Sequence, residues 1–148
     1  MGFRFRLQRV LQLAEVEEEV ARSAYEKQID LLQEYQASLS RIEEERRSMA
    51  ADLARPQGRT VGELRAAEAR VLALDRRGER ERQRVEEQRR RADEARHTLR
   101  HQWAEREKFT RLRAKLLQQH RLRQERATQL ELDDLVASRH GRSPAERR

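Results

Sequence analysis

Apolar residues recur along the first 53 residues at alternating steps of four and three, which is the spacing of a heptad repeat. Eleven of the fourteen positions in this phase are apolar. Six consecutive heptads in one phase predict a long helix, and the narrow seam is typical of a coiled coil, because a helix of a globular protein has a wider apolar face. The seam positions are Leu7, Leu11, Ala14, Glu18, Ala21, Tyr25, Gln28, Leu32, Tyr35, Leu39, Ile42, Arg46, Met49 and Leu53.

The segment 54–60 (ARPQGRT) interrupts this pattern. Pro56 cannot continue a helix, and Gly58 tolerates the backbone angles of a chain reversal. Thr60 and Glu63 then have capping-box spacing, in which each side chain accepts a hydrogen bond from the backbone amide of the other residue. We therefore predict a helix over about 5–54, a turn over 55–60 and a second helix from about 61.

The second predicted helix repeats the heptad more weakly, with polar or small residues at 78, 81 and 88. Its seam positions are Leu64, Ala67, Val71, Leu74, Gly78, Glu81, Val85, Gln88, Ala92, Ala95 and Leu99. A connection this short makes consecutive helices antiparallel neighbours. The predicted fold is therefore all-α: one antiparallel coiled-coil hairpin over 1–148, with a longer second helix that ends near 137 and a disordered tail over 138–148.

The unequal lengths of the two predicted helices leave part of the second one without a partner. If the turn centres near residue 57, residues 109–137 extend beyond the start of the first helix, over roughly 40 Å. This C-terminal extension carries apolar residues that an isolated helix exposes to water. Such a helix favours docking on another protein.

The composition argues against an enzyme and against a membrane-spanning or disulfide-linked protein. Charged residues make up 41% of the chain and aromatic residues 4%, which leaves little for a globular core or a dry catalytic pocket. Cysteine is absent, no apolar run approaches the roughly 20 residues of a membrane span, and the first residues lack a signal-peptide pattern. We expect a cytoplasmic protein with no catalytic residue, no cofactor and no small-molecule substrate.

Charge is unevenly distributed. Residues 1–55 have 9 basic and 11 acidic side chains, a net of −2, and residues 56–148 have 25 and 16, a net of +9. Residues 76–91 contain eight arginines that could follow a phosphate backbone. Interleaved glutamates can pair with them along the helix, and aromatic residues for base stacking are missing there. A basic coiled coil that binds nucleic acid is therefore the alternative function, and a parallel self-associating coiled coil is the alternative architecture.

A few side chains invite a more specific interpretation. His97 and His101 lie one helical turn apart, but no glutamate follows His97 and no third ligand is evident, so a solvated helix face is favoured over a metal site. Tyr25 and Tyr35 occupy seam positions. Alternatively, Tyr35 and Trp103 reach the surface and anchor a partner, as aromatic residues do at interface hot spots.

Three segments resemble the flagellar FliJ family. They are the opening 3–15 (FRFRLQRVLQLAE) followed by 17–21 (EEEVA), the segment 103–108 (WAEREK), and the ending 130–137 (LELDDLVA). The resemblance covers the whole chain. It implies a cytoplasmic component of the flagellar type III export apparatus, at the inner face of the inner membrane, whose coiled coil looks like the central stalk of a rotary ATPase. Departing from this pattern, the second helix carries a polar segment, 78–82 (GERER).

The resemblance further implies partners. The stalk would enter the ring of the export ATPase FliI and promote its assembly, contact the export gate protein FlhA, and bind export chaperones. By position, the ATPase-binding candidates are Phe3, Phe5, Leu7, Phe109, Leu112, Leu116, Leu130 and Leu135. The gate-binding candidates are Tyr35, Leu39, Ile42, Val71 and Leu74. The gate candidates are also seam positions, so packing between the helices is the competing use of these side chains.

Overall fold

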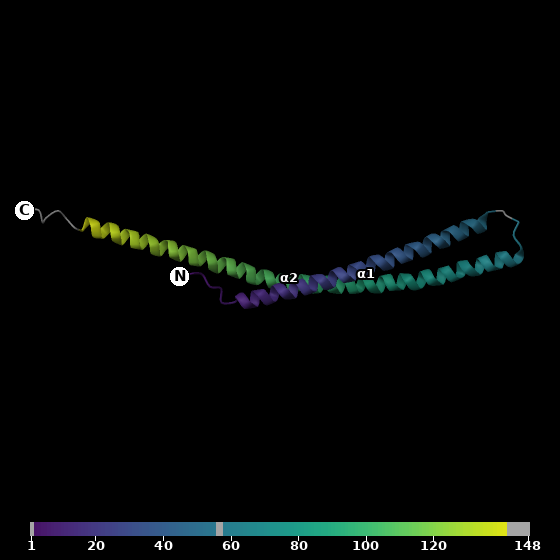
Figure 1. Ribbon diagram of the computed structural model, residues 1–148, viewed down its shortest axis with the longest axis horizontal. Helices are drawn as coiled ribbons and strands as arrows, with labels where there is room; N and C mark the ends of the chain where they lie inside the picture. Colours follow the sequence, from purple (N-terminus) through teal and green to yellow (C-terminus); the bar gives the residue numbers. More distant parts are fainter. Residues whose placement is uncertain (1, 56–57, 142–148) are drawn as a thin grey trace, which may run out of the picture. The chain divides into compact units, whose positions relative to one another are not determined.

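The computed structural model describes residues 2–55 and 58–141, which form two long helices and no strand (Figure 1). Helix α1 covers Gln8–Ala54 and helix α2 covers Val61–His140. The predicted all-α fold with two packed helices is confirmed. Helix α1 begins three residues later than expected and α2 ends three residues later. Residues 56–57 of the predicted turn and 142–148 of the predicted tail lie outside the described residues.

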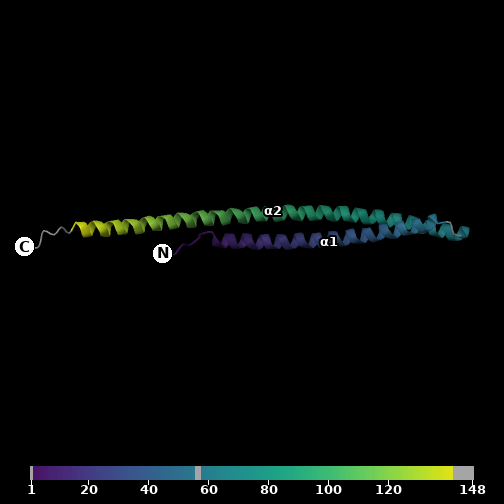
Figure 2. The same ribbon diagram turned by 90° about the horizontal axis from the view of Figure 1, so that it is seen from above.

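Contacts divide the chain into two compact units, and each joins part of α1 to part of α2. One unit consists of Glu17–Trp103, here called the hairpin unit. The other consists of Met1–Val16 together with Ala104–Arg148, here called the terminal unit. Within the hairpin unit the two helices lie side by side and run antiparallel in both views (Figures 1 and 2).

The heptad positions form the interface of the hairpin unit. All of its predicted α1 seam residues except Arg46, and all of its α2 seam residues except Leu64, are buried or half-buried. Gly78, Glu81 and Gln88 are buried although none of them is a large apolar residue. Heptad phase therefore decides which face packs, and residue type decides how well it packs.

The polar seam residues are satisfied by hydrogen bonds. The Gln88 Nε2 atom donates to the backbone oxygen of Gln28 at 3.0 Å and to its Oε1 atom at 2.7 Å. The buried Glu81 carboxylate accepts from Arg84 at 3.3 Å. No buried polar side-chain atom in the described part of the chain lacks a partner. Because an unpaired buried polar group is costly, the bonds between Gln88 and Gln28 favour one register of α1 against α2.

The Gln28–Gln88 contact can be tested by a double-mutant cycle. Replacing Gln88 by Leu leaves the Gln28 amide without its partner, so we expect the free energy of unfolding to fall by about 1–2 kcal/mol. Adding Gln28→Leu should restore most of that loss, because both polar groups are then removed. Urea unfolding followed by circular dichroism measures both effects. Additive losses in the double variant would contradict this account.

The N-terminus of α2 has the predicted cap. The Thr60 amide donates to Glu63 Oε2 at 2.9 Å, and the Glu63 amide donates to Thr60 Oγ1 at 3.3 Å. The Leu64 amide donates to the Thr60 carbonyl at 3.1 Å and opens the helical ladder. The capping box predicted from the sequence is confirmed, and it fixes where α2 starts.

Gly78 offers a stabilising substitution in the middle of α2. A Cβ atom added there would lie 3.7 Å from Ile42 Cγ2, an ordinary van der Waals distance. Glycine inside a helix costs about 0.8–1 kcal/mol relative to alanine. We expect Gly78→Ala to raise the free energy of unfolding by about 0.5–1 kcal/mol in urea titrations. Gly62→Ala is the control, since nothing lies within 4 Å of its added Cβ; a lower midpoint for Gly78→Ala would contradict the prediction.

In the terminal unit, the described residues before α1 are not helical. The Gln8 amide donates to the Phe5 carbonyl at 3.0 Å, and Phe5 and Leu11 are buried. The Phe3 ring lies 5.7 Å from the His120 ring, tilted by 44°. This non-helical segment explains why α1 starts at Gln8.

The contact between Phe3 and His120 corrects the predicted extent of the unpaired helix. We expected α2 to lack a partner from Phe109 onward, but Phe109, Leu117 and His120 are half-buried. Every described residue from 121 to 141 is exposed. The solvent-exposed end of α2 therefore begins at residue 121. Within the described residues, neither helix holds a stretch apolar and long enough to cross a membrane.

Candidate partner-binding surfaces

The exposed end of α2 presents several large apolar side chains to solvent. Leu130 is 65% exposed and Leu135 58%. On the same stretch Leu122, Leu132 and Val136 are also exposed. Large apolar side chains gathered on one solvated helix are a marker of protein–protein contact, whereas single exposed ones are ordinary.

The structure divides the eight predicted ATPase-binding residues into two groups. Phe5 is buried, and Phe3, Leu7 and Phe109 are half-buried, so these four contribute to packing within the terminal unit. The other four are exposed and available to a partner: Leu112, Leu116, Leu130 and Leu135.

Cations without an ion pair gather before and at the start of this apolar stretch. Five basic residues between 113 and 126 are exposed and form no ion pair within the described part of the chain, and Glu125 is the only carboxylate among them. They are Arg113, Lys115, Arg121, Arg123 and Arg126. By contrast, Arg111 just before them pairs with Glu107 at 3.1 Å. A surface of this kind suits an acidic partner.

The arginine-rich stretch 76–91 is more strongly neutralised. Four of its eight arginines pair with glutamates along α2: Arg82 with Glu79, Arg84 with Glu81, Arg89 with Glu86, and Arg91 with Glu87. The predicted pairing along the helix is therefore confirmed at these four positions. It lowers the charge that this stretch presents to a phosphate backbone.

The five gate-binding candidates all lie at the interface between the helices of the hairpin unit. Ile42 and Leu74 are buried, at 4% and 8% exposure. Tyr35, Leu39 and Val71 are half-buried, so only these three offer part of their surface to a partner.

Tyr35 is held by a cation from the opposite helix. The guanidinium of Arg84 lies 4.4 Å from the centre of the Tyr35 ring, within cation–π range. Hydrogen bonding to Tyr35 and the negative charge of Glu81 raise the pKa of the Arg84 side chain above its usual value. The arginine side chain is always charged, and its contact holds the tyrosine ring against α2.

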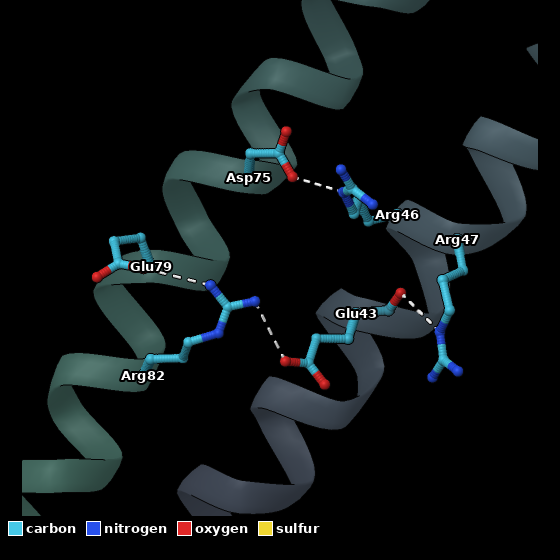
Figure 3. A network of polar contacts seen from close by, with 6 residues as sticks. All are labelled: Glu43, Arg46, Arg47, Asp75, Glu79 and Arg82. Carbon is cyan, nitrogen blue, oxygen red and sulfur yellow. Dashed lines mark hydrogen bonds and ion pairs between the residues drawn. The ribbon is translucent and has the colours of Figure 1, made fainter.

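Ion pairs also join α1 to α2 in the hairpin unit (Figure 3). Arg46 Nε lies 2.5 Å from Asp75 Oδ1, and Arg82 lies 3.2 Å from Glu79 and 3.4 Å from Glu43. Both pairs between α1 and α2 are exposed, so each contributes only about 0–1 kcal/mol. These ion pairs form in the same register of α1 against α2 that the seam residues favour.

The remaining candidates occupy simple environments. Trp103 is 48% exposed, which leaves it available as an anchor, whereas Tyr25 is half-buried on the seam. His97 and His101 are exposed. Among the described residues, no group of three or more potential metal ligands is found.

One surface feature was missed by the sequence reasoning. Helix α1 has a second set of heptad-spaced positions, each one residue before a seam position: 10, 13, 17, 20, 24, 27 and 31. Its large apolar members are exposed, and they are Val10, Leu13, Val20 and Leu31. We call this set the outer stripe. The signal was present in the sequence as a second repeat, shifted by one residue from the first.

Comparison with known proteins identifies the family. The chain matches the family model of the flagellar FliJ protein over residues 3–145, which includes the opening segment, both helices and the stretch around Trp103. No curated protein and no solved structure matches the chain. The chain therefore belongs to the flagellar FliJ family, whose members are components of flagellar protein export.

Proposed function

We propose that this protein is the stalk of a flagellar export ATPase. In this role, it binds within the ring formed by FliI, promotes ring assembly and ATP hydrolysis, and connects the ring to the export gate protein FlhA and to export chaperones. The protein hydrolyses nothing itself. It resides in the cytoplasm and joins the inner membrane peripherally through the export apparatus.

The observation that carries this proposal is the exposed end of α2 in a chain of this family. A helix with large leucines and unpaired cations in water lowers its free energy when a partner covers it. A ring encloses a helix on all sides, which matches residues 121–140, where every residue of the helix is exposed. Leu112, Leu116, Leu130 and Leu135 would supply the apolar contacts, while Phe3, Phe5, Leu7 and Phe109 support the base of that helix.

Gate binding is assigned to the hairpin unit. Tyr35, Leu39 and Val71 keep part of their surface exposed, and the buried Ile42 and Leu74 would hold the two helices beneath them. Truncating the half-buried residues removes contact surface, whereas truncating the buried ones perturbs the packing that presents it. The two groups should therefore differ in their effect on stability for a given loss of gate binding.

The mechanism that follows is mechanical and allosteric. A ligand shifts a conformational equilibrium only through its different affinities for the two states. A stalk promotes hydrolysis when it binds the catalytically competent arrangement of ring subunits more tightly than the others. A tenfold activation corresponds to a differential binding free energy of about 1.4 kcal/mol.

The test is the effect of the purified protein on its cognate export ATPase. We expect added protein to raise both the rate of ATP hydrolysis and the mass of the ATPase assembly, measured by phosphate release and by light scattering. A heat-unfolded sample of the same protein is the control. Unchanged rate and unchanged mass at saturating protein would overturn the proposal.

A further inference from the structure

The outer stripe gives α1 a second, partly apolar face, because five of its seven positions are apolar and only Glu17 and Lys27 are charged. A shift of one residue rotates a position by about 100° around the helix, so the outer stripe lies beside the seam and not on it. The seam residues Leu11 and Ala14 are buried, whereas Leu13 is 57% exposed and Val20 65%. A helix with two adjacent heptad faces can pack against two different helices, and α2 of the same chain covers only one of them.

Unpaired carboxylates outnumber unpaired cations on and beside the outer stripe. Three exposed carboxylates there form no ion pair within the described residues: Glu17 belongs to the stripe, Glu34 continues its spacing and Asp30 lies beside it. One stripe position, Lys27, is basic. The helix that covers the outer stripe should therefore be basic as well as apolar.

The end of α2 has that chemistry. Its five unpaired cations lie between residues 113 and 126, and the exposed Leu112 and Leu116 adjoin them. Residues 10–31 of α1 span about 32 Å and residues 112–130 of α2 about 27 Å at 1.5 Å per residue. The two surfaces therefore carry opposite charge, both contain exposed apolar side chains, and they are similar in length.

We propose that two copies of this protein associate, with residues 112–130 of α2 from one copy packed on the outer stripe of the other. Each copy carries both surfaces, so two copies of this chain supply everything that the contact needs. The apolar residues supply most of the affinity, and the opposite charges favour this pairing over pairing of like surfaces.

Dimerisation has a consequence for the ATPase, and this step rests on the proposed function. The ring would bind Leu112, Leu116 and Leu130, and the partner copy would cover these same side chains. Ring and second copy therefore compete for the end of α2, and the dimer is a resting form that ATPase dissociates. Dimerisation itself is measured without ATPase, so the two ideas can fail separately.

The first test is the mass of the protein in solution. Sedimentation equilibrium of the full chain should give a dimer that weakens as salt is raised, because salt screens the charged contacts. Leu13→Glu combined with Val20→Glu should raise the dissociation constant at least tenfold with unchanged helicity. The control is Gln33→Glu with Ser40→Glu, which adds the same charge at exposed positions of α1 away from the outer stripe.

A second test identifies the contacting surfaces. The chain has no cysteine, so single cysteines can be introduced at Leu13 or Val20 and, in separate samples, at Leu116 or Arg123. Mixing the two kinds of variant should give disulfides between an α1 site and an α2 site in preference to disulfides between like sites. A monomer at all concentrations, a dimer insensitive to the outer-stripe substitutions, or disulfides confined to like sites would each overturn the proposal.

Discussion

Replacing Ile42 by Ala is expected to lower the free energy of unfolding of the hairpin unit by about 2–5 kcal/mol. Ile42 is 4% exposed, and its Cγ2 atom faces Gly78, whose missing side chain cannot move to fill the space. The substitution therefore leaves a cavity in addition to removing apolar contacts. Urea unfolding followed by circular dichroism measures the loss.

Two further variants make the Ile42 prediction specific. Leu72→Ala removes a similar apolar group from a site that is 57% exposed, so its effect should stay within about 0.5 kcal/mol. Adding Gly78→Ala to Ile42→Ala places a methyl group toward the cavity, so the two effects should not be additive. Equal losses for Ile42→Ala and Leu72→Ala would show that the two helices do not pack in this register.

The second large effect is expected at the exposed end of α2. Leu130→Glu combined with Leu135→Glu should reduce stimulation of the export ATPase at least tenfold, because two charges are placed where the ring must bury apolar surface. Both side chains are more than half exposed, so helicity and the unfolding midpoint should not change. ATP hydrolysis at several concentrations of the variant measures the loss.

The control for this pair carries the same chemistry elsewhere. Val61→Glu with Leu72→Glu also replaces two exposed apolar residues by glutamate, but in the hairpin unit. We expect stimulation of the ATPase to remain within twofold of the unmodified protein. If both pairs reduced stimulation equally, net charge would explain the result and the end of α2 would have no special role.

Heptad phase predicted the packing of the hairpin unit well, for a physical reason. The helical period determines which positions face the partner helix before residue type is considered. Glu81 and Gln88 were thus identified as seam residues although they are polar, and both are buried. The capping box at Thr60 and Glu63 was equally predictable, since it depends on two side chains three residues apart.

The terminal unit was harder to predict because its first residues follow no period. Nothing in the sequence indicates that a non-helical segment places Phe3 against His120. For that reason the start of the exposed part of α2 was expected at 109 and lies at 121. Likewise, among the ATPase-binding candidates, burial of Phe5 results from this local chain path.

The candidate contact residues depend on information that lies outside one chain. Periodicity identifies Ile42 and Leu74 as interface positions, but it cannot distinguish packing within the hairpin from packing on a partner. Exposure separates these uses: both residues are buried, whereas Leu130 and Leu135 are exposed. The outer stripe could have been found from sequence alone, because Val10, Leu13 and Val20 already form a second repeat.

Hydrogen exchange of the full chain, diluted until it is monomeric and measured alone and with the export ATPase assembled, tests most directly whether the exposed end of α2 is the ring-binding surface. Exchange of backbone amides reports local opening, and a helix end without tertiary partners exchanges fast. The account predicts strong slowing of exchange over 121–137 when the ring is added, with little change over 17–103. Slowing confined to 17–103, or no slowing anywhere, would contradict it.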